Sequence, residues 1–198
     1  MTNLSTLAGP ARFELIVKKS RFVAQAIAIE QAEQAPAFLA SVHATHANHH
    51  CWAYRIRDAY RSSDDGEPAG TAGRPILAAI GGQQYDRVMV VVSRWFGGIK
   101  LGAGGLVRAY GGAASECLRG AVRNPLLELA QIAIACGFEH VGTVHQLIAQ
   151  LGASKRAEIF TNDGLHFDIE LPRERLPVLQ NALRDATRGQ ICIVDATE

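Results

Sequence analysis

Residues 94 to 112, RWFGGIKLGAGGLVRAYGG, place seven glycines and three cations between a valine-rich run and an expected helix. The first N–H groups of a helix have no partner inside it, and they lie at the positive end of its dipole. Glycine at those positions lets an oxyanion approach the backbone closely. We therefore predict that the helix start at Gly102, Gly104 and Gly105 forms an anion-binding concavity that holds a phosphate.

Four cationic side chains are assigned to the same surface. Arg94 is expected at the rim from the preceding strand, Lys100 from the turn, and Arg108 within two helical turns. Arg74 comes from a polar loop earlier in the chain. The stretch matches neither the nucleotide P-loop nor the dinucleotide-binding pattern, which weakens an ordinary nucleotide-enzyme interpretation.

Close packing is the competing explanation of the glycines. Gly111 and Gly112 are expected inside the helix, where each costs about 1 kcal/mol relative to alanine. Their presence would be explained if the helix lay very close to the sheet. In that case the N–H groups of Gly104 and Gly105 would already be bonded within the protein, and no anion site would exist.

An acidic cluster, Asp64, Asp65 and Glu67, lies in the loop RSSDDGEPAGTAGRP at 61–75. Two carboxylates in different environments can act as a general acid and a general base, and carboxylates can also hold Mg²⁺ against a phosphate. Alternatively, they can bond nearby backbone N–H groups or pair with Arg74 or Arg94, as Asp-Gly and Glu-Pro turns favour. We favour the turn interpretation.

Histidines gather before and within an expected strand and invite a zinc interpretation. His46 and His50 are four residues apart, but His50 is expected to begin the strand, so the two need not share a helix face. The separations fit no structural-zinc pattern. We therefore predict strand-edge histidines beside a buried cysteine, and neither a metal nor a cofactor. The residues concerned are His43, His46, His49, His50 and Cys51.

The apolar patterns of the first half predict a mixed domain of helices and strands. Strands are expected at 13–19, 22–30, 49–58 and 86–96, and helices at 31–46, 76–80 and 103–119. The run Val88 to Val92 is the most apolar and is typical of a central strand.

The second half predicts a β-α-β-β-α-β order, which fits a ferredoxin-like sandwich. Strands are expected at 126–137, on both sides of Asn162-Asp163-Gly164 and at 191–197, and helices at 144–151 and 176–186. Asn124 precedes a proline and prefers an extended conformation. We therefore predict an α+β fold with two domains, 1–124 and 125–198.

Composition favours a globular protein without a membrane segment. The chain has 198 residues, 48% of them hydrophobic and 20% charged. No all-aliphatic run exceeds five residues, no signal-peptide pattern begins the sequence, and four widely spaced cysteines favour reduced thiols in the cytoplasm. Residues 1–124 carry 14 Lys or Arg and 9 Asp or Glu, a net charge of +5, whereas 125–198 carry 6 and 10, a net of −4. This asymmetry indicates different partners for the two halves and an anionic ligand for the first.

Four segments together resemble the IMPACT family, in its bacterial YigZ-type branch: KKSRF (18–22), HHCWAY (49–54), SSDDGEPAGTAGRPIL (62–77) and the glycine stretch. The resemblance implies an N-terminal domain like domain 2 of ribosomal protein S5. It also implies a ferredoxin-like C-terminal domain resembling domain V of elongation factor G. Eukaryotic relatives regulate translation by competing for an activator of a stress kinase. The resemblance supplies no catalytic residues.

Two functions follow as hypotheses. The favoured one is a non-catalytic, translation-linked binding or regulatory protein. Its N-terminal domain would contact RNA, the ribosome or another polyanion, and its C-terminal domain would face a protein partner. The alternative is a small-molecule hydrolase that uses the acidic loop and the glycine-rich helix start. A deep pocket joining the acidic cluster to Gly104 and Gly105 would favour the hydrolase, and a shallow basic face would favour binding.

Overall fold

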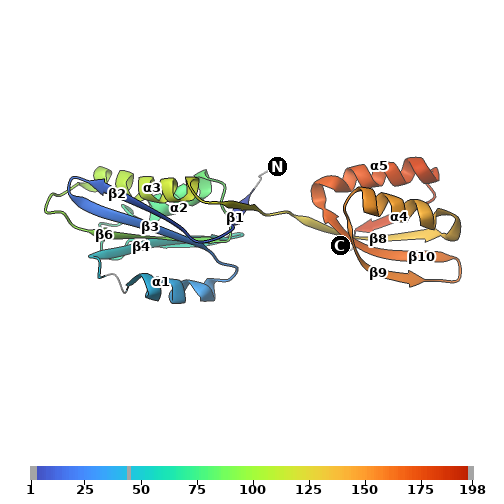
Figure 1. Cartoon of the computed structure of the whole chain (residues 1–198), viewed down its shortest axis with the longest axis horizontal. Coiled ribbons are helices and arrows are strands. Elements are labelled where there is room, and N and C mark those ends of the chain that lie inside the picture. Colours follow the sequence, from blue (N-terminus) through green and yellow to red (C-terminus); the bar gives the residue numbers. More distant parts are fainter. Residues whose placement is uncertain (1–3, 44–45, 196–198) are drawn as a thin grey trace. The chain divides into compact units, whose positions relative to one another are not determined.

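The most apolar run of the sequence, Val88 to Val92, forms the middle of a five-stranded antiparallel sheet (Figure 1). The computed structural model describes residues 4–43 and 46–195. Across the sheet the strands are β2 (Ala11–Val17), β3 (Ser20–Ala28), β6 (Val88–Trp95), β4 (His49–Ile56) and β5 (Ala59–Ser63). Every residue of β6 except Trp95 is buried, because helices cover both faces of the sheet.

Helices cover both faces of this sheet (Figure 1). Helices α2 (Gly73–Gly82) and α3 (Ala103–Arg119) pack on the face that carries Val88, Val90 and Val92. Helix α1 (Ala35–His43) packs on the opposite face, against Met89 and Val91. Successive side chains of β6 therefore pack into two separate apolar clusters, one on each face of the sheet. This explains why the sequence from Val88 to Val92 is apolar without interruption.

The segment from 59 to 82 differs from the expectation of a long polar loop and a short helix. Strand β5 occupies its start, and α2 begins three residues earlier than the predicted 76–80 helix. The N–H groups of Ala72 and Gly73 donate to the Asp64 carboxylate at 2.9 and 2.8 Å. Asp64 therefore caps α2 from eight residues before Ala72. Sequence rules for helix starts consider only the residues directly before the helix, so they do not detect this cap.

Two further differences concern short elements. The predicted helix at 31–46 is a 3₁₀ turn followed by α1, which ends at His43; residues 44–45 lie outside the described residues. Strands β1 (Ser5–Leu7) and β7 (Arg123–Pro125) form a small antiparallel pair that the sequence did not predict. Three residues are too few to show an apolar period.

The second unit has the predicted β-α-β-β-α-β order (Figure 1). Its elements are β8 (Leu129–Gly137), α4 (Val141–Gln150), β9 (Ser154–Phe160), β10 (Gly164–Pro172), α5 (Leu176–Thr187) and β11 (Cys192–Asp195). The sheet order is β11-β8-β10-β9, with α4 and α5 packed on one face, so the α+β, two-domain fold class is confirmed. The predicted end of the last strand, at 196–197, lies outside the described residues.

The chain divides into a first unit, Met1–Leu126, and a second unit, Leu127–Glu198. Strand β7 belongs to the first unit because it pairs with β1, and the Leu126 N–H donates to the Leu4 carbonyl at 2.9 Å. None of the described helices combines the length and apolarity needed to cross a membrane.

We expect a fragment ending at Leu126 to fold alone, because the first unit has its own apolar clusters and retains the β1–β7 pair. Limited proteolysis of the whole chain should cleave just after this pair, near Leu127. Circular dichroism of the fragment should show a cooperative thermal transition. An unfolded fragment from a stable parent chain would contradict the independence of the first unit.

Candidate anion-binding site

The glycine stretch connects β6 to α3 and passes close to the turn between β2 and β3. A Cβ at Gly97 would lie 2.0 Å from the carbonyl carbon of Lys19, so only glycine fits there. Gly102 adopts a φ of 71°, and α3 begins at the next residue. The lysine turn, Lys18-Lys19, is thereby brought beside the start of α3.

The start of α3 leaves backbone N–H groups open. The first bond of this helix runs from the Leu106 N–H to the Gly102 carbonyl at 3.0 Å. Among the described residues, no partner accepts a hydrogen bond from the N–H of Gly104 or Gly105. A Cβ at Gly104 would meet only the end of the Arg108 side chain, at 3.8 Å, so a side chain at this position would meet no backbone.

The two glycines farther along α3 have different neighbours. A Cβ at Gly111 would lie 3.4 Å from Cβ of Pro75, so this glycine permits close packing of α3 against α2 rather than against the sheet. A Cβ at Gly112 would have no neighbour within 4 Å. Close packing therefore explains Gly111 and does not explain Gly104 or Gly112.

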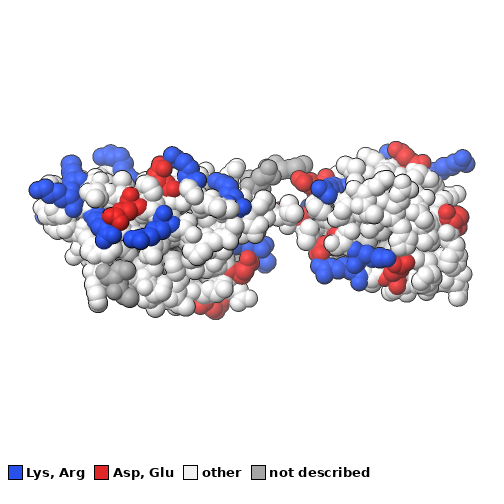
Figure 2. All heavy atoms as spheres, viewed as in Figure 1, with Lys and Arg blue, Asp and Glu red and all other residues white. Residues whose placement is uncertain are grey.

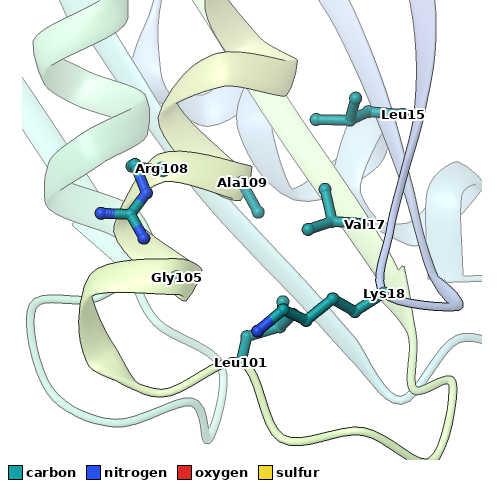
Figure 3. Close-up of a pocket in the computed structure, with 7 residues that line it drawn as sticks. All are labelled: Leu15, Val17, Lys18, Leu101, Gly105, Arg108 and Ala109. Carbon is teal, nitrogen blue, oxygen red and sulfur yellow. The ribbon is translucent and has the colours of Figure 1, made fainter.

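Three exposed cations surround the helix start: Lys18, Lys100 and Arg108. None of them forms an ion pair with another described residue. Lys18 and Arg108 line a small cavity of about 160 Å³ together with Leu101 and Gly105, and Figure 3 shows Lys18 reaching from the β2–β3 turn toward Leu101. Lys18 was not among the residues predicted for the site, although it begins the KKSRF segment.

A larger cavity of about 520 Å³ opens on the other side of the helix start, and we call it the Phe96 cavity. Its lining combines cationic, aromatic and amide side chains with the backbone before α3. The residues that line it are Asn48, His49, Glu67, Pro68, Arg94, Phe96, Lys100, Leu101, Gly102, Ala103 and Leu106. Asn48, His49 and Phe96 were also not predicted for the site. Asn48 and His49 lie beside the cavity because β4 pairs with β6, which places His49 opposite Arg94, whereas Phe96 belongs to the glycine stretch itself.

Arg94 does not behave as the rim cation expected from the sequence. It is only 6% exposed, and its guanidinium pairs with the Glu67 carboxylate at 2.5 Å. The Tyr110 hydroxyl donates to the same carboxylate at 2.7 Å, and burial raises the pKa of Tyr110, which keeps this donor protonated. The guanidinium carbon lies 5.5 Å from the ring centres of both Phe22 and Phe96. Arg94 is therefore a fixed part of the wall of the Phe96 cavity and not a movable ligand-binding group.

The acidic cluster is occupied by hydrogen bonds within the protein. Asp64 accepts from the N–H groups of Gly70, Ala72 and Gly73 at 2.7 to 2.9 Å. Burial opposes ionisation of Asp64, but these N–H groups outweigh it and hold its pKa below the ordinary value. Asp65 accepts from the His50 N–H at 2.6 Å.

Among the described residues, neither of the two cavities at the helix start joins the three carboxylates to Gly104 and Gly105, as the hydrolase alternative required. Glu67 lines the Phe96 cavity, whereas Asp64 and Asp65 line neither that cavity nor the smaller one. With Glu67 held by Arg94 and Tyr110, the cluster offers no free pair of carboxylates for acid–base work. The turn interpretation of this loop therefore agrees with its geometry.

The remaining predicted residues lie apart from the helix start. Arg74 is exposed on the first turn of α2, near Asp64, and lines neither cavity. The His50 ring bonds the Ser93 hydroxyl at 2.8 Å and stacks near His43, with 4.4 Å between ring centres. Within 4–43 and 46–195, no group of three or more His, Cys, Asp or Glu side chains is placed to hold a metal ion.

Burial also affects the ionisation of Cys51, which lies beside these histidines. It raises the pKa of Cys51 to about 12, so this residue remains a thiol at neutral pH. The thiol donates to the Asp64 carbonyl at 2.9 Å and helps to hold the acidic loop against β4.

Comparison with known families assigns both units. Residues 18–118 match the Impact N-terminal domain, and residues 134–190 match a domain of unknown function, DUF1949. The first match includes the lysine turn, the acidic loop and the glycine stretch. The second lies within the ferredoxin-like unit.

Three curated proteins illustrate the relationship. The chain is 47% identical over 180 residues to an IMPACT family member of Thermus thermophilus, covering 90% of this chain and 99% of the relative. It is 34% identical to the IMPACT family member YigZ of Escherichia coli K12, covering 96% and 97%. YvyE of Bacillus subtilis is 38% identical over 131 residues, covering 63% and 60%. A solved structure described as a hypothetical protein is 32% identical, with a TM-score of 0.63, covering 100% and 99%.

The Glu67–Arg94 pair should be strongly coupled in the free energy of unfolding. Arg94→Met or Glu67→Met alone leaves a buried charge without its partner and should cost about 3–5 kcal/mol. The double variant should lose less than the sum of the single losses, by about 0.5–3 kcal/mol. Urea denaturation followed by circular dichroism measures all three.

The exposed Arg119–Glu116 pair, at 2.9 Å, is the matched control and should show a coupling below about 1 kcal/mol. Equal coupling in the buried and the exposed pair would contradict the structural importance of Glu67 and Arg94.

Proposed function

The chain belongs to the IMPACT family, and we propose that it is a non-catalytic, translation-linked binding protein whose first unit contacts RNA, free or in the ribosome. The contact surface consists of the α3 start, Lys18, Lys100 and Arg108. A single phosphate occupies the concavity over the Gly104 N–H, and the neighbouring cations hold adjacent phosphates. The bond-making groups are backbone amides and cations, which recognise phosphate without depending on base sequence.

The observation that supports this proposal most directly is the absence of acidic partners for these cations among the described residues. A cation that already pairs with a carboxylate gains little from a phosphate, whereas Lys18, Lys100 and Arg108 have full charges to neutralise. In Figure 2, lysine and arginine side chains gather where Figure 1 places α2, α3 and the end of β2, with some acidic side chains among them.

The acidic loop adds to the positive charge of this surface, because its carboxylates are bound within the protein. Glu67 is buried against Arg94, and Asp64 is surrounded by backbone N–H groups. The carboxylates nearest the helix start are thus compensated, while the cations are not. The local field favours an anionic partner although the whole chain carries a net charge of only +1.

We further propose that the second unit faces a protein partner. Its edge strand β9 carries two exposed apolar side chains, Ile159 and Phe160, which are 57% and 73% exposed. A sheet edge with apolar side chains is a surface on which another protein can dock. The net charge of −4 over residues 125–198 disfavours RNA as the partner of this unit.

Replacing a phosphate-binding cation should weaken RNA binding and reduce its salt dependence. Lys100→Gln and Arg108→Gln each remove one contact, so each should flatten the plot of log affinity against log salt by about one unit. Fluorescence anisotropy with a fluorescein-labelled oligouridylate, measured across a salt series, gives both the affinity and the slope.

Arg119→Gln is the matched control, because it removes the same charge from the other end of α3, where Arg119 pairs with Glu116 at 2.9 Å. Its salt slope should stay close to that of the unmodified chain. If all three variants behave alike, net charge alone explains the binding and the assigned site is wrong.

Replacing Gly104 with valine should lower affinity without unfolding the protein. A side chain there would meet no backbone, since its nearest neighbour is the flexible end of Arg108 at 3.8 Å, but it would cover the open amide. Loss of a hydrogen bond to a charged group weakens binding about tenfold or more. Thermal denaturation and anisotropy are measured on the same samples.

Gly112→Val serves as the control, because it also projects into open space on α3 but lies two turns from the helix start. Unchanged affinity in a folded Gly104→Val variant would show that the amide does not receive a phosphate.

A further inference from the structure

We propose that the Phe96 cavity receives an unpaired base of the bound RNA, so that the first unit selects single-stranded over double-stranded RNA. This inference rests on the proposed function and adds the class of RNA that the site takes. It concerns the Phe96 cavity, whose size and apolar lining phosphate contacts do not explain.

The size and lining of the Phe96 cavity do not suit a phosphate alone. Its volume of about 520 Å³ falls in the range of pockets that bind whole small molecules rather than single ions. Much of its wall is apolar, from Pro68, Phe96, Leu101 and Leu106. A ligand that fills it must therefore combine an apolar body with an anionic end, as a nucleotide does.

Phe96 offers a stacking surface for a base. It is 48% exposed although it is aromatic, and the guanidinium of Arg94 lies 5.5 Å from its ring centre. Phe22 lies at the same distance from the guanidinium, so Arg94 lies close to both rings. The buried Glu67–Arg94 pair holds this guanidinium in place, and a base could stack on the exposed area of Phe96.

Two side chains supply hydrogen-bonding groups for the edge of such a base. The Asn48 carbonyl oxygen accepts from the Phe96 N–H at 2.8 Å, which orients the amide and leaves its Nδ2 donor without a partner among the described residues. Nδ1 of His49 lies 2.7 Å from the Asp65 carbonyl oxygen, which can only accept. Nδ1 therefore carries the hydrogen, and Nε2 of the neutral ring is an acceptor. The cavity thus presents one donor and one acceptor beside an aromatic surface.

The phosphate groups of the proposed contact lie next to this cavity. Lys100 and Gly102 line it, and α3 begins one residue after Gly102. A nucleotide whose base stacks on Phe96 can therefore place its own phosphate at the cation-rich helix start. In a duplex the bases are stacked on one another and paired, so their faces cannot stack on Phe96.

The test compares three labelled probes of equal length: an oligouridylate, the same strand paired with oligoadenylate, and an abasic strand with the same backbone charge. The unmodified protein should bind the oligouridylate at least about fivefold more tightly than the abasic strand, because stacking contributes that much per base. Phe96→Ala should remove this difference and leave affinity for the duplex unchanged. Phe96→Tyr, which keeps the ring, should retain the preference.

Two controls separate stacking from folding and from general apolar contact. Phe138→Ala removes another exposed phenylalanine, from the second unit, and should leave all three affinities unchanged. If Phe96→Ala does not fold by circular dichroism, Phe96→Leu keeps an apolar side chain without the aromatic face and should also lose the preference.

The outcomes distinguish this inference from the proposed function. Equal affinity for the oligouridylate and the abasic strand, with a salt slope that Lys100→Gln still flattens, overturns base recognition and leaves phosphate binding standing. Equal loss of affinity for all three probes in folded Phe96→Ala also overturns it. Failure of every probe to bind overturns the proposed function and this inference together.

Discussion

The buried Glu67–Arg94 pair is the interaction on which the geometry of the site depends. It joins the acidic loop to β6, the Tyr110 hydroxyl adds α3, and Ser20 Oγ, which accepts from Nη2 of Arg94 at 3.5 Å, adds the start of β3. An ion pair withdrawn from water repays its desolvation only when its geometry is good and further hydrogen bonds satisfy it. Four segments far apart in the sequence must therefore come together at this pair. Because Glu67 and Arg94 also line the Phe96 cavity, the pair fixes part of the cavity wall.

The charges in this region are divided between the interior and the surface. The carboxylates of the acidic loop are used to build the fold: Asp64 caps α2, Asp65 holds the start of β4, and Glu67 neutralises Arg94. The cations Lys18, Lys100 and Arg108 remain on the surface. This division gives a nearly neutral chain a strongly polarised face, and it explains why net charge is a poor guide to the partner of such a protein.

Local patterns in the sequence were sufficient to predict the fold class. The uninterrupted apolar run of β6, the apolar stripe of α3 and the Asn162-Asp163-Gly164 hairpin each depend on residues within one element, and each formed as predicted. The start of α2 was missed because its cap, Asp64, is eight residues away from Ala72. Arg94 was assigned to the rim of the anion site, although the turn interpretation of the acidic loop also named it as a possible partner of a carboxylate. The sequence could not decide between these roles, because Glu67, the partner of Arg94, is 27 residues distant. Sequence reasoning also missed Lys18, Asn48, His49 and Phe96, and among these Asn48 and Phe96 meet through the register of β4 with β6.

The lysine turn shows how this fold accepts local strain at the site. Lys18 and Lys19 both adopt positive φ angles, 44° and 68°, in a two-residue hairpin where glycine or asparagine is preferred. Left-handed conformations cost side-chain-bearing residues about 1–2 kcal/mol each. Glycine in this turn would relieve that cost, but it would remove Lys18 from the cavity that this residue shares with Arg108. Gly97 accommodates the turn from the opposite side, because no other residue fits against the Lys19 carbonyl. The positive φ angles of Lys18 and Lys19 and the absence of a side chain at Gly97 thus have the same result. Together they hold the Lys18 cation beside the open amides of α3.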